Sequence, residues 1–356
     1  MLSTDPDLSL WVALAVSVLF FWLALKSRLN YQAIPRISTG HPSKTPPDCM
    51  VVIPARNEEA TIARAVRSFP HDTVIVVDDH SQDGTAEAAR QAGAGVLPAP
   101  DLVRGAIGKS NACMAGARVL TSRWVLFADA DTWYEPGFVD AAVAYAEVNS
   151  LSFLSVYLQP ECETWAEHVL VPFGAALYFC GVNPKDDPAA SFNGQCLLVR
   201  RESYQFIGGH SAVLTDLAED VKLAVLAQRH RLGVGVARAS GLGHVRMHAG
   251  FHGVQEGFAR NAMRFMVVSS WIGARIIFAA LAMALWLPAL IWLAIDAHWV
   301  VASIFALLPS VLLKTWYRSW TALLAPLAIY GMLPVLARGL RFTLGGGQGK
   351  WKGRTL

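Results

Sequence analysis

The pattern of apolar and polar positions divides the chain into three parts. Residues 8–25 form an apolar run without a charge, followed by Lys26 and Arg28. From residue 49, short β-branched runs alternate with Ala-rich stretches, and from residue 265 the chain becomes strongly apolar again. The alternation predicts an α/β block, and the flanking apolar segments predict membrane helices on both sides of it.

Within the middle part, the residue pattern predicts individual elements. The predicted strands are Met50–Ile53, Thr73–Val77, Trp124–Ala128, Leu151–Tyr157, Gln195–Val199 and Leu232–Ala237, and the predicted helices are Glu58–Ser68 and Thr85–Gln91.

The charges beside the first apolar run set its expected orientation. Acidic Asp5 and Asp7 precede it and basic residues follow it, which is the reverse of a cleavable signal peptide. We therefore expect an uncleaved anchor with the α/β block in the cytoplasm, so that the protein is multi-pass in the cell inner membrane.

The C-terminal part contains three apolar runs, 276–295, 299–313 and 320–337. The tail after Ala337 carries basic but no acidic residues and is expected to be cytoplasmic, which requires an even number of crossings. The run 299–313 or the last run is therefore predicted to be re-entrant or interfacial.

The amphipathic stretch 265–274 is predicted to be an interfacial helix that admits a lipid from the bilayer. The sequence therefore predicts five parts of the chain. They are an N-terminal transmembrane anchor at 1–28, a linker at 29–48, a cytoplasmic catalytic domain at 49–264, an interfacial helix with C-terminal membrane segments at 265–337, and a basic cytoplasmic tail at 338–356.

Composition and charge narrow the function classes. The chain is 54% hydrophobic and only 16% charged, whereas about 25% charged is typical of soluble domains. A net charge of +3 without a long basic run excludes nucleic acid as the expected partner. The five cysteines form no CxxC pair or Cys/His ligand spacing, so they are interpreted as packing residues.

Acidic residues follow the predicted strands, where open parallel sheets bind ligands. Asp78 and Asp79 follow one strand, Asp129 and Asp131 follow another, and Glu219-Asp220 comes later. Two carboxylates on one turn suit a hard cation such as Mg²⁺ or Mn²⁺ bound together with a diphosphate. The same acidic residues are also suited to capping the helices that follow.

In order over about 200 residues, the chain carries VVIPARNEE at 51–59, VDDHS at 77–81 with DGT at 83–85, GK at 108–109, DAD at 129–131 and ED at 219–220. These motifs resemble those of a family-2 glycosyltransferase. FNGQ at 192–195, GGH at 208–210 and WKGR at 351–354 resemble the membrane-bound subset that acts on lipids and includes hopene-associated, carotenoid-type and ceramide glucosyltransferases. The resemblance implies an α/β fold, namely a GT-A (nucleotide-diphospho-sugar transferase) domain with a mostly parallel sheet, plus N-terminal and C-terminal transmembrane helices. It also implies a nucleotide-sugar donor and inversion at the anomeric carbon.

The resemblance also implies roles for single residues. Asp220, with Glu219 beside it, is the expected general base, and Asp131 is the expected ligand of the divalent cation. The residues implied to bind the donor are Pro54, Arg56 and Glu58 at the nucleobase, Asp78 and Asp79 at the uracil or ribose, Lys109 at the nucleotide, and Asp129 at the ribose or sugar.

Further candidates lie outside the acidic motifs. Gln195 and His210 are candidates to line the acceptor opening, and His244 or His248 to complete the metal shell as a neutral imidazole. Processive members carry QxxRW, whereas this chain has Asn261 to Phe265 without that motif, so a non-processive enzyme is expected. Arg264, with Arg260 as its competitor, is a candidate to bind the leaving diphosphate or to anchor the chain at the lipid headgroups.

Together these observations predict an inverting transferase that moves a sugar from a nucleotide-sugar, expected to be a UDP-sugar, to the hydroxyl of a membrane lipid on the cytoplasmic leaflet. Two alternatives stay open. The first is transfer to a polyprenyl phosphate, and the second is a non-catalytic membrane scaffold that keeps the fold.

Overall fold

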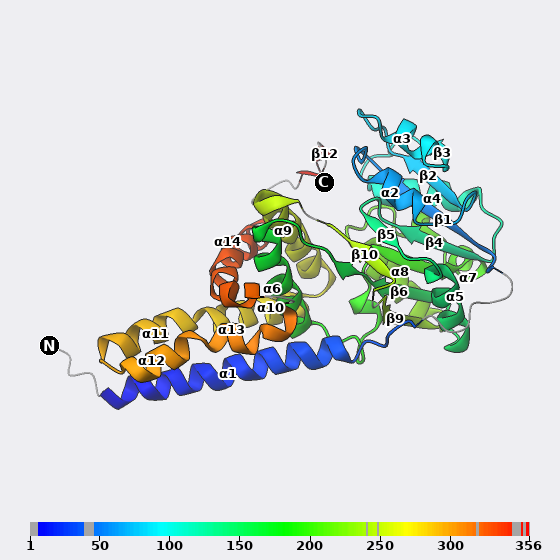
Figure 1. The fold of residues 1–356 in the computed structure, drawn as a ribbon. Helices are drawn as coiled ribbons and strands as arrows, with labels where there is room; N and C mark the ends of the chain where they lie inside the picture. The colour runs from blue at the N-terminus through cyan, green and yellow to red at the C-terminus, as the bar shows by residue number, and fades with distance from the viewer. Residues whose placement is uncertain are drawn as a thin grey trace. The chain divides into compact units, whose positions relative to one another are not determined.

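The computed structural model divides into two compact units, which Figure 1 shows with their elements labelled. It describes residues 6–38, 46–239, 241–247, 249–317, 320–343, 350, 351, 354 and 355. One unit is built around a β-sheet and comprises Ile34–Glu161, Pro184–Met247 and Gln348–Leu356. The other is helical and comprises Met1–Ala33, Cys162–Asn183 and His248–Gly347.

The larger sheet of the first unit has seven strands among the described residues, and most neighbouring pairs are parallel. Only β8 runs antiparallel to both its neighbours. In spatial order the strands are β3 (Gly95–Pro98), β2 (Val74–Asp78), β1 (Cys49–Ala55), β4 (Trp124–Ala128), β8 (Cys196–Arg200), β6 (Phe153–Tyr157) and β9 (Val234–Arg238). This arrangement confirms the predicted GT-A fold with a mostly parallel sheet.

Helices cover both faces of this sheet, because its central strands are apolar on both sides. One face packs against α2 (Ile62–Arg67), α3 (Thr85–Gln91) and α5 (Phe138–Val148). The other face packs against α4 (Gly108–Arg118), where a Cβ on Gly116 would lie 2.5 Å from Val52. Glycine at this position therefore lets α4 approach the sheet closely.

Smaller elements complete the unit. Among the described residues, a three-stranded sheet follows the DAD motif and consists of β5 (Thr132–Tyr134), β10 (Gly243–Val245) and β7 (Gln159–Pro160). The remaining helical elements are η1 (Ala189–Ser191), α7 (Arg201–Phe206), η2 (Gly209–Val213) and α8 (Glu219–Arg229), and a short hairpin is formed by β11 (Lys350–Trp351) and β12 (Arg354–Thr355).

Part of the predicted Pro-rich linker is ordered against the sheet. Arg238 of β9 donates its backbone N–H to Pro35, and Ile37 donates to the Arg238 carbonyl. The Arg238 Nε donates to the Ile34 carbonyl over 3.0 Å. Ile34 and Ile37 are both buried, so this segment extends the sheet unit rather than tethering it loosely.

The helical unit contains the apolar segments. Among the described residues, four helical segments are long and apolar enough to cross a membrane, namely Leu8–Gln32, Trp271–Ile295, Trp299–Trp316 and Trp320–Gly339. The elements of this unit are α1 (Pro6–Gln32), α6 (Trp165–Gly181), α9 (Gly250–Val268), α10 (Ser270–Ala284), α11 (Trp286–Ile295), α12 (Trp299–Ala306), α13 (Leu308–Leu312), η3 (Lys314–Trp316), η4 (Trp320–Leu324) and α14 (Ala325–Thr343).

Helix α6 was not predicted from the sequence, and it belongs to the helical unit although it lies within residues 49–264. It packs against α1, where Ser27 donates to the Ala176 carbonyl and Asn30 donates to the Phe179 carbonyl. Its Gly174 is in contact with Phe258 of α9. The predicted continuous catalytic block is therefore interrupted by a helix that completes the helical bundle.

The predicted interfacial helix over 265–274 is not a separate element. Helix α9 ends at Val268, and α10 begins after Ser269, whose hydroxyl accepts the backbone N–H of Ile272 over 3.5 Å. The N-cap at Ser269 therefore divides the amphipathic stretch between two longer helices.

Candidate active site

The predicted acidic residues meet at one edge of the larger sheet. Strands β2, β1 and β4 are parallel neighbours, so their carboxyl ends lie side by side. Asp78 is the last residue of β2, and Asp129 directly follows β4. The sheet topology therefore collects the motifs into one site.

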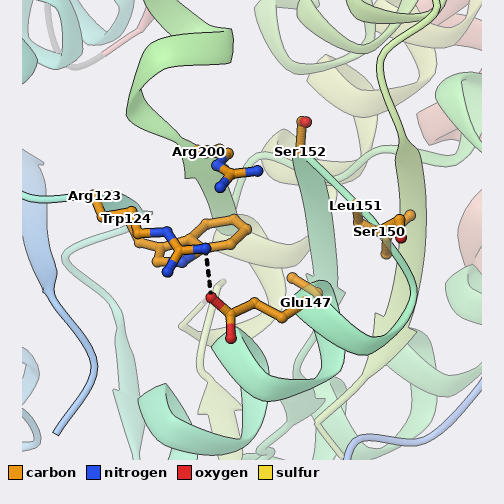
Figure 2. Close-up of a pocket in the computed structure, with 8 residues that line it drawn as sticks. Arg123, Trp124, Glu147, Ser150, Leu151, Ser152 and Arg200 are labelled. Atoms are coloured by element: carbon orange, nitrogen blue, oxygen red, sulfur yellow. Dashed lines mark ion pairs between the residues drawn. The ribbon is translucent and has the colours of Figure 1, made fainter.

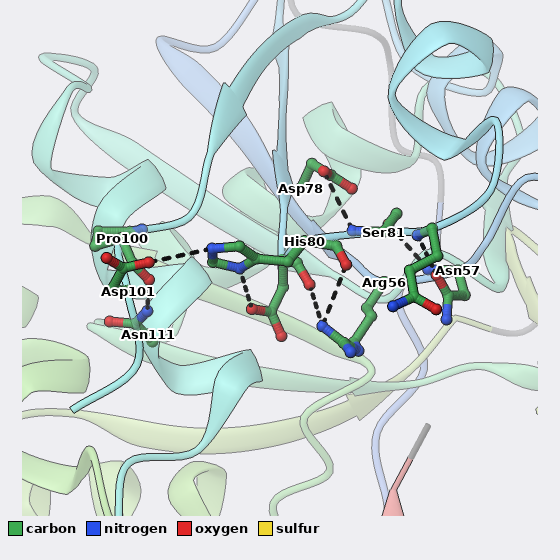
Figure 3. Close-up of polar contacts among 10 residues, drawn as sticks. Arg56, Asn57, Asp78, His80, Ser81, Pro100, Asp101 and Asn111 are labelled. Carbon is green, nitrogen blue, oxygen red and sulfur yellow. Dashed lines mark hydrogen bonds and ion pairs between the residues drawn. The ribbon is translucent and has the colours of Figure 1, made fainter. Parts of the chain in front are cut away.

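The turn after β2 is held by the residue that follows β1. The Arg56 Nη1 group donates to the Asp79 carbonyl over 2.6 Å and to the His80 carbonyl over 3.4 Å, as Figure 3 shows. The Asp79 backbone N–H donates to the Ala55 carbonyl, and the Asp79 side chain is buried. Arg56 thus positions the Asp79-His80 backbone, and its predicted contact with the nucleobase stays a prediction.

His80 connects this turn to the loop after β3. Its backbone has φ +57°, and its ring lies with Nδ1 3.3 Å from Asp79 Oδ1 and Nε2 3.5 Å from Asp101 Oδ1 (Figure 3). Asn111 of α4 donates to the Pro100 carbonyl over 2.7 Å and holds the same loop. Sequence reasoning missed these contacts, because they join three segments that are distant along the chain.

Asp78 accepts the Ser81 backbone N–H with Oδ2, while its other oxygen, Oδ1, is buried without a hydrogen-bond partner among the described residues. Pro54 lies in β1 opposite Val77. Glu58 donates its backbone N–H to Thr85, and its carboxylate lies close enough to Asp131 to raise the pKa of that group. The predicted donor residues of the first two motifs are therefore all at the carboxyl edge of β1 and β2.

Lys109 is the centre of a charged cluster at the start of α4. Its Nζ lies 2.6 Å from Asp129 Oδ1 and 3.7 Å from Glu219 Oε1, and it donates to the Gly194 carbonyl over 2.9 Å. Burial alone would lower the pKa of the ammonium, but the carboxylates of Asp129 and Glu219 hold it above its ordinary value. Lys109 is consequently a fixed positive charge beside the DAD motif.

Asp131 lies beside this cluster with an unusual protonation equilibrium. Burial, followed by the charges of Asp129 and Glu58, raises the pKa of its carboxyl to about 7, although Lys109 acts in the opposite direction. Asp131 Oδ1 is buried and has no hydrogen-bond partner in the described part of the chain. A divalent cation would both satisfy this oxygen and relieve the repulsion between the carboxylates, so these residues fit a metal ion.

The described residues contain no preformed group of three or more His, Cys, Asp or Glu that could hold a metal. The predicted ligand His248 lies outside the described residues. His244, the other imidazole candidate, is stacked on Trp133 with ring centroids 5.5 Å apart, and its Nδ1 lies 2.9 Å from Glu161 Oε1. Among the described residues, Asp131 and Asp129 are thus the carboxylates available to a cation together with a diphosphate.

The predicted base, Asp220, is buried at the start of α8. Its Oδ2 accepts the Gly194 backbone N–H over 2.6 Å, and Oδ1 accepts the N–H of Val221 over 2.9 Å. Gly194 therefore joins the two halves of the site, because its carbonyl accepts from Lys109 and its N–H donates to Asp220. The sequence predicted a role for the neighbouring Gln195 but none for Gly194.

Gln195 lies next to this junction. Its carbonyl accepts the Asp129 backbone N–H, and its Oε1 accepts from Asn193 Nδ2 over 2.9 Å. With the amide oriented in this way, the Nε2 group is buried and has no acceptor among the described residues. An unpartnered donor next to the DAD motif is available to a bound hydroxyl or phosphate oxygen.

His210, predicted to lie on the acceptor side, is buried in this structure, and its role toward an acceptor stays a prediction. The side chain is buried against Phe127, and its Nδ1 lies 2.7 Å from the Tyr204 hydroxyl. Burial, followed by the positive charge of Lys109, lowers the pKa of its imidazole to about 3, so the ring is neutral at physiological pH. Its contacts are those of a packed structural histidine.

Arg264 lies in α9 of the helical unit, and its side chain is outside the described part of the structure. The structure therefore brings together the donor, base and carboxylate candidates of the sheet unit, and it leaves the predicted diphosphate contact of Arg264 as a prediction.

Comparison with known proteins shows what this chain is similar to. The family described as Glycosyl transferase family 2 matches residues 50–208. A 4,4'-diaponeurosporenoate glycosyltransferase of Staphylococcus haemolyticus is 26% identical over 264 residues, covering 67% of this chain and 70% of the relative. The Staphylococcus aureus protein of the same name is 30% identical over 225 residues, and the alignment spans 59% of this chain and 60% of that relative.

Among solved structures, a mannosyltransferase from Pyrobaculum calidifontis in complex with GDP-Man and Mn²⁺ aligns with a TM-score of 0.57 and 17% identity. The alignment covers 92% of this chain and 98% of that one, and it shows a shared fold. Residues 50–208 thus match the family-2 glycosyltransferase model and have the GT-A fold, and the relatives named glycosyltransferases support a transferase enzyme whose chain carries helices long and apolar enough to span a membrane.

Proposed function

We propose that this protein is an inverting, non-processive glycosyltransferase that moves a sugar from a nucleotide-sugar to a membrane lipid hydroxyl on the cytoplasmic leaflet. The observation that carries the proposal is a set of buried polar atoms at the carboxyl edge of the sheet that have no hydrogen-bond partner among the described residues, namely Asp78 Oδ1, Asp131 Oδ1 and Gln195 Nε2. A buried unsatisfied polar group costs roughly 1–3 kcal/mol, so a site that retains several of them is built for a polar ligand.

The two unpartnered acceptors and the unpartnered donor match the chemistry of a nucleotide-sugar. Asp78 would accept a hydroxyl or imide proton of the nucleoside, and Gln195 would donate to an oxygen of the sugar or diphosphate. A divalent cation, held by Asp131 and Asp129, would neutralise charge on the diphosphate. We assign the uridine nucleotide on the sequence resemblance, and the GDP-Man in the aligned mannosyltransferase structure supports a nucleotide-sugar as the donor class.

In the transfer, the bond between the anomeric carbon and the diphosphate oxygen breaks, and the diphosphate leaves with the electron pair. The acceptor hydroxyl oxygen forms the new bond on the opposite face of the carbon, which inverts its configuration. Asp220 takes the hydroxyl proton, and the Gly194 N–H orients its carboxylate for this step. The Lys109 ammonium balances the negative charges of Asp129 and Glu219 while negative charge develops on the leaving diphosphate.

The membrane-spanning candidates and the names of the relatives support a lipid acceptor. We propose that the chain is multi-pass in the cell inner membrane, with the sheet unit in the cytoplasm and the basic tail on the same side, as the flanking charges indicate. An even number of crossings after the sheet unit follows from that orientation.

The relatives are named for a carotenoid acid, and this favours a second candidate acceptor with an oxygen that is already anionic. A carboxylate acceptor, or a polyprenyl phosphate, would not need a base. Asp220→Asn would then retain most turnover, whereas a hydroxyl acceptor would lose nearly all of it.

The test is release of nucleoside diphosphate by the purified full chain in detergent, with Mg²⁺ or Mn²⁺, across a panel of UDP- and GDP-sugars. A total bacterial lipid extract supplies the acceptor, and the glycolipid product is identified by mass spectrometry. Lipid-dependent release that is lost in Asp131→Ala supports the proposal and names the donor. Nucleotide binding without transfer to any lipid overturns it in favour of a non-catalytic scaffold.

A further inference from the structure

A cavity lies at the amino end of β4, opposite the candidate active site. It has a volume of about 360 Å³ and is lined by Arg123, Trp124, Glu147, Ser150, Ser152 and Arg200, together with Ala146 and Leu151 (Figure 2). Trp124 is the first residue of β4, and the DAD motif follows the last residue of that strand. The cavity is therefore separate from the candidate active site and takes no part in the proposed transfer.

Strand register explains why its side chains converge. Trp124 and Arg200 are directly opposite each other in the antiparallel pair of β4 and β8. The backbone N–H of Arg200 donates to Ser152, which precedes β6 on the other side of β8. These residues form a row across three neighbouring strands, on the face of the sheet that α5 covers. Glu147 in the last turn of α5 and Ser150 just after it complete the lining of the cavity.

The lining consists mainly of hydrogen-bond donors. The Arg123 guanidinium is paired with Glu147 over 3.1 Å, as Figure 2 shows. Arg200 has no carboxylate within salt-bridge distance among the described residues. Two guanidinium groups against one carboxylate leave the cavity with a net positive charge, and the serine hydroxyls add further donors.

The buried indole of Trp124 gives the second, independent observation. Trp124 is 2% exposed, and its Nε1–H has no hydrogen-bond partner in the described part of the chain. A tryptophan buried in a core usually finds an acceptor for this donor. An acceptor bound in the cavity that Trp124 lines would supply it.

We propose that this cavity binds a compact oxyanion of the phosphate type, either a small soluble phosphate ester or the phosphate of an acidic lipid headgroup. Its volume is at the lower end of the range of about 300–1,000 Å³ for small-molecule sites. Arg200 forms the primary charge contact, and the Trp124 N–H adds a directional hydrogen bond.

The experiment measures binding of inorganic phosphate and of glycerol 3-phosphate to the full chain in detergent by isothermal titration calorimetry, against chloride at equal ionic strength. EDTA and saturating UDP are present, so that the candidate active site does not contribute. We expect saturable binding that Arg200→Gln weakens at least tenfold and that Trp124→Phe weakens severalfold. Arg229→Gln, which removes a charge from α8 and does not line the cavity, should bind as the unmodified protein does.

Trp124→Phe is the more discriminating variant, because it removes a donor that has no partner in the described part of the chain. The smaller ring leaves space in the core and should lower the thermal stability, so binding is measured at a temperature at which circular dichroism shows the variant to be folded. Nanodiscs with phosphatidic acid, compared with phosphatidylcholine alone, distinguish a lipid headgroup from a soluble ester. No saturable binding of either soluble probe or of the acidic lipid, or binding that survives both Arg200→Gln and Trp124→Phe, overturns the proposal. Sugar transfer is measured separately, so failure of this site leaves the proposed activity intact.

Discussion

The Lys109 ammonium lies 2.6 Å from the Asp129 carboxylate, and the same ammonium donates to the carbonyl of Gly194, whose N–H donates to Asp220. This chain of contacts joins the start of α4, the end of β4 and the start of α8. A charge placed to compensate the DAD motif therefore also fixes the peptide that orients the proposed base.

Replacing Lys109 with Met should destabilise the protein and abolish transfer, because Asp129 and the buried Glu219 would lose their counter-charge. Breaking a buried ion pair costs about 3–5 kcal/mol, and we expect the lower part of that range because Lys109 and Asp129 are each partly exposed. Thermal unfolding in detergent measures the change. Lys222→Met, which breaks an exposed pair with Asp216 at 3.9 Å, should cost about 0–1 kcal/mol, and equal losses in the two variants would contradict the assigned role.

Adding one methyl group at Gly194 should impair turnover more than stability. A Cβ there would lie 3.1 Å from Asp220 Oδ2 and 3.3 Å from Glu219 Oε1, so both carboxylates would have to move by a few tenths of an ångström. Misplacement of a catalytic group by about 1 Å costs roughly a hundredfold, and we expect Gly194→Ala to lower kcat by roughly tenfold. Steady-state kinetics with the identified donor gives the value. The matched control is Gly95→Ala in β3, where the nearest atom would be 3.8 Å away, and its kcat should not change.

Asp131 should make the metal-free protein less stable as the pH rises. Its pKa is raised to about 7 in the folded state from 3.8, so the folded protein binds more protons between these values. The stabilisation is fully present below about pH 4 and is lost as the pH rises through 7. Thermal unfolding in EDTA, compared between the unmodified protein and Asp131→Asn over this window, isolates the contribution as a difference. Mn²⁺ should raise the melting temperature of the unmodified protein above pH 7 and have little effect on the variant.

His210 should make the protein sensitive to acid without affecting the acceptor. Its pKa of about 3 in the folded state lies below the ordinary 6.5, so the unfolded chain takes up a proton first as the pH falls. Stability is therefore lost between about pH 6.5 and pH 3. His210→Gln retains an acceptor for the Tyr204 hydroxyl and cannot titrate, so its unfolding temperature should depend less on pH in this window. A changed KM for the lipid acceptor in this variant would restore His210 to the acceptor side.

The local sequence determined much of the sheet unit. The predicted strand Trp124–Ala128 and helix Thr85–Gln91 have the observed boundaries, because a short β-branched or apolar run and an Ala-rich stretch after DGT are local signals. The acidic motifs were found for the same reason, since each directly follows or precedes such an element. The first anchor was also found from its uninterrupted apolar run, although α1 extends further at both ends.

Tertiary structure decided what local patterns do not encode. Gly194 is 85 residues from Lys109 and 26 residues from Asp220 along the chain, and only the folded sheet makes Gly194 the link between the other two. Helix α6 lies inside the α/β sequence but belongs to the helical unit, because its apolar surface is buried against α1 and α9 rather than against the sheet. The burial of His210 against Phe127 and Tyr204 also depends on the fold and could not be predicted from local sequence. Hydrophobic periodicity predicts which face of a segment is buried. It does not predict which other segments cover that face, because those contacts join residues far apart in the chain and form only in the folded protein.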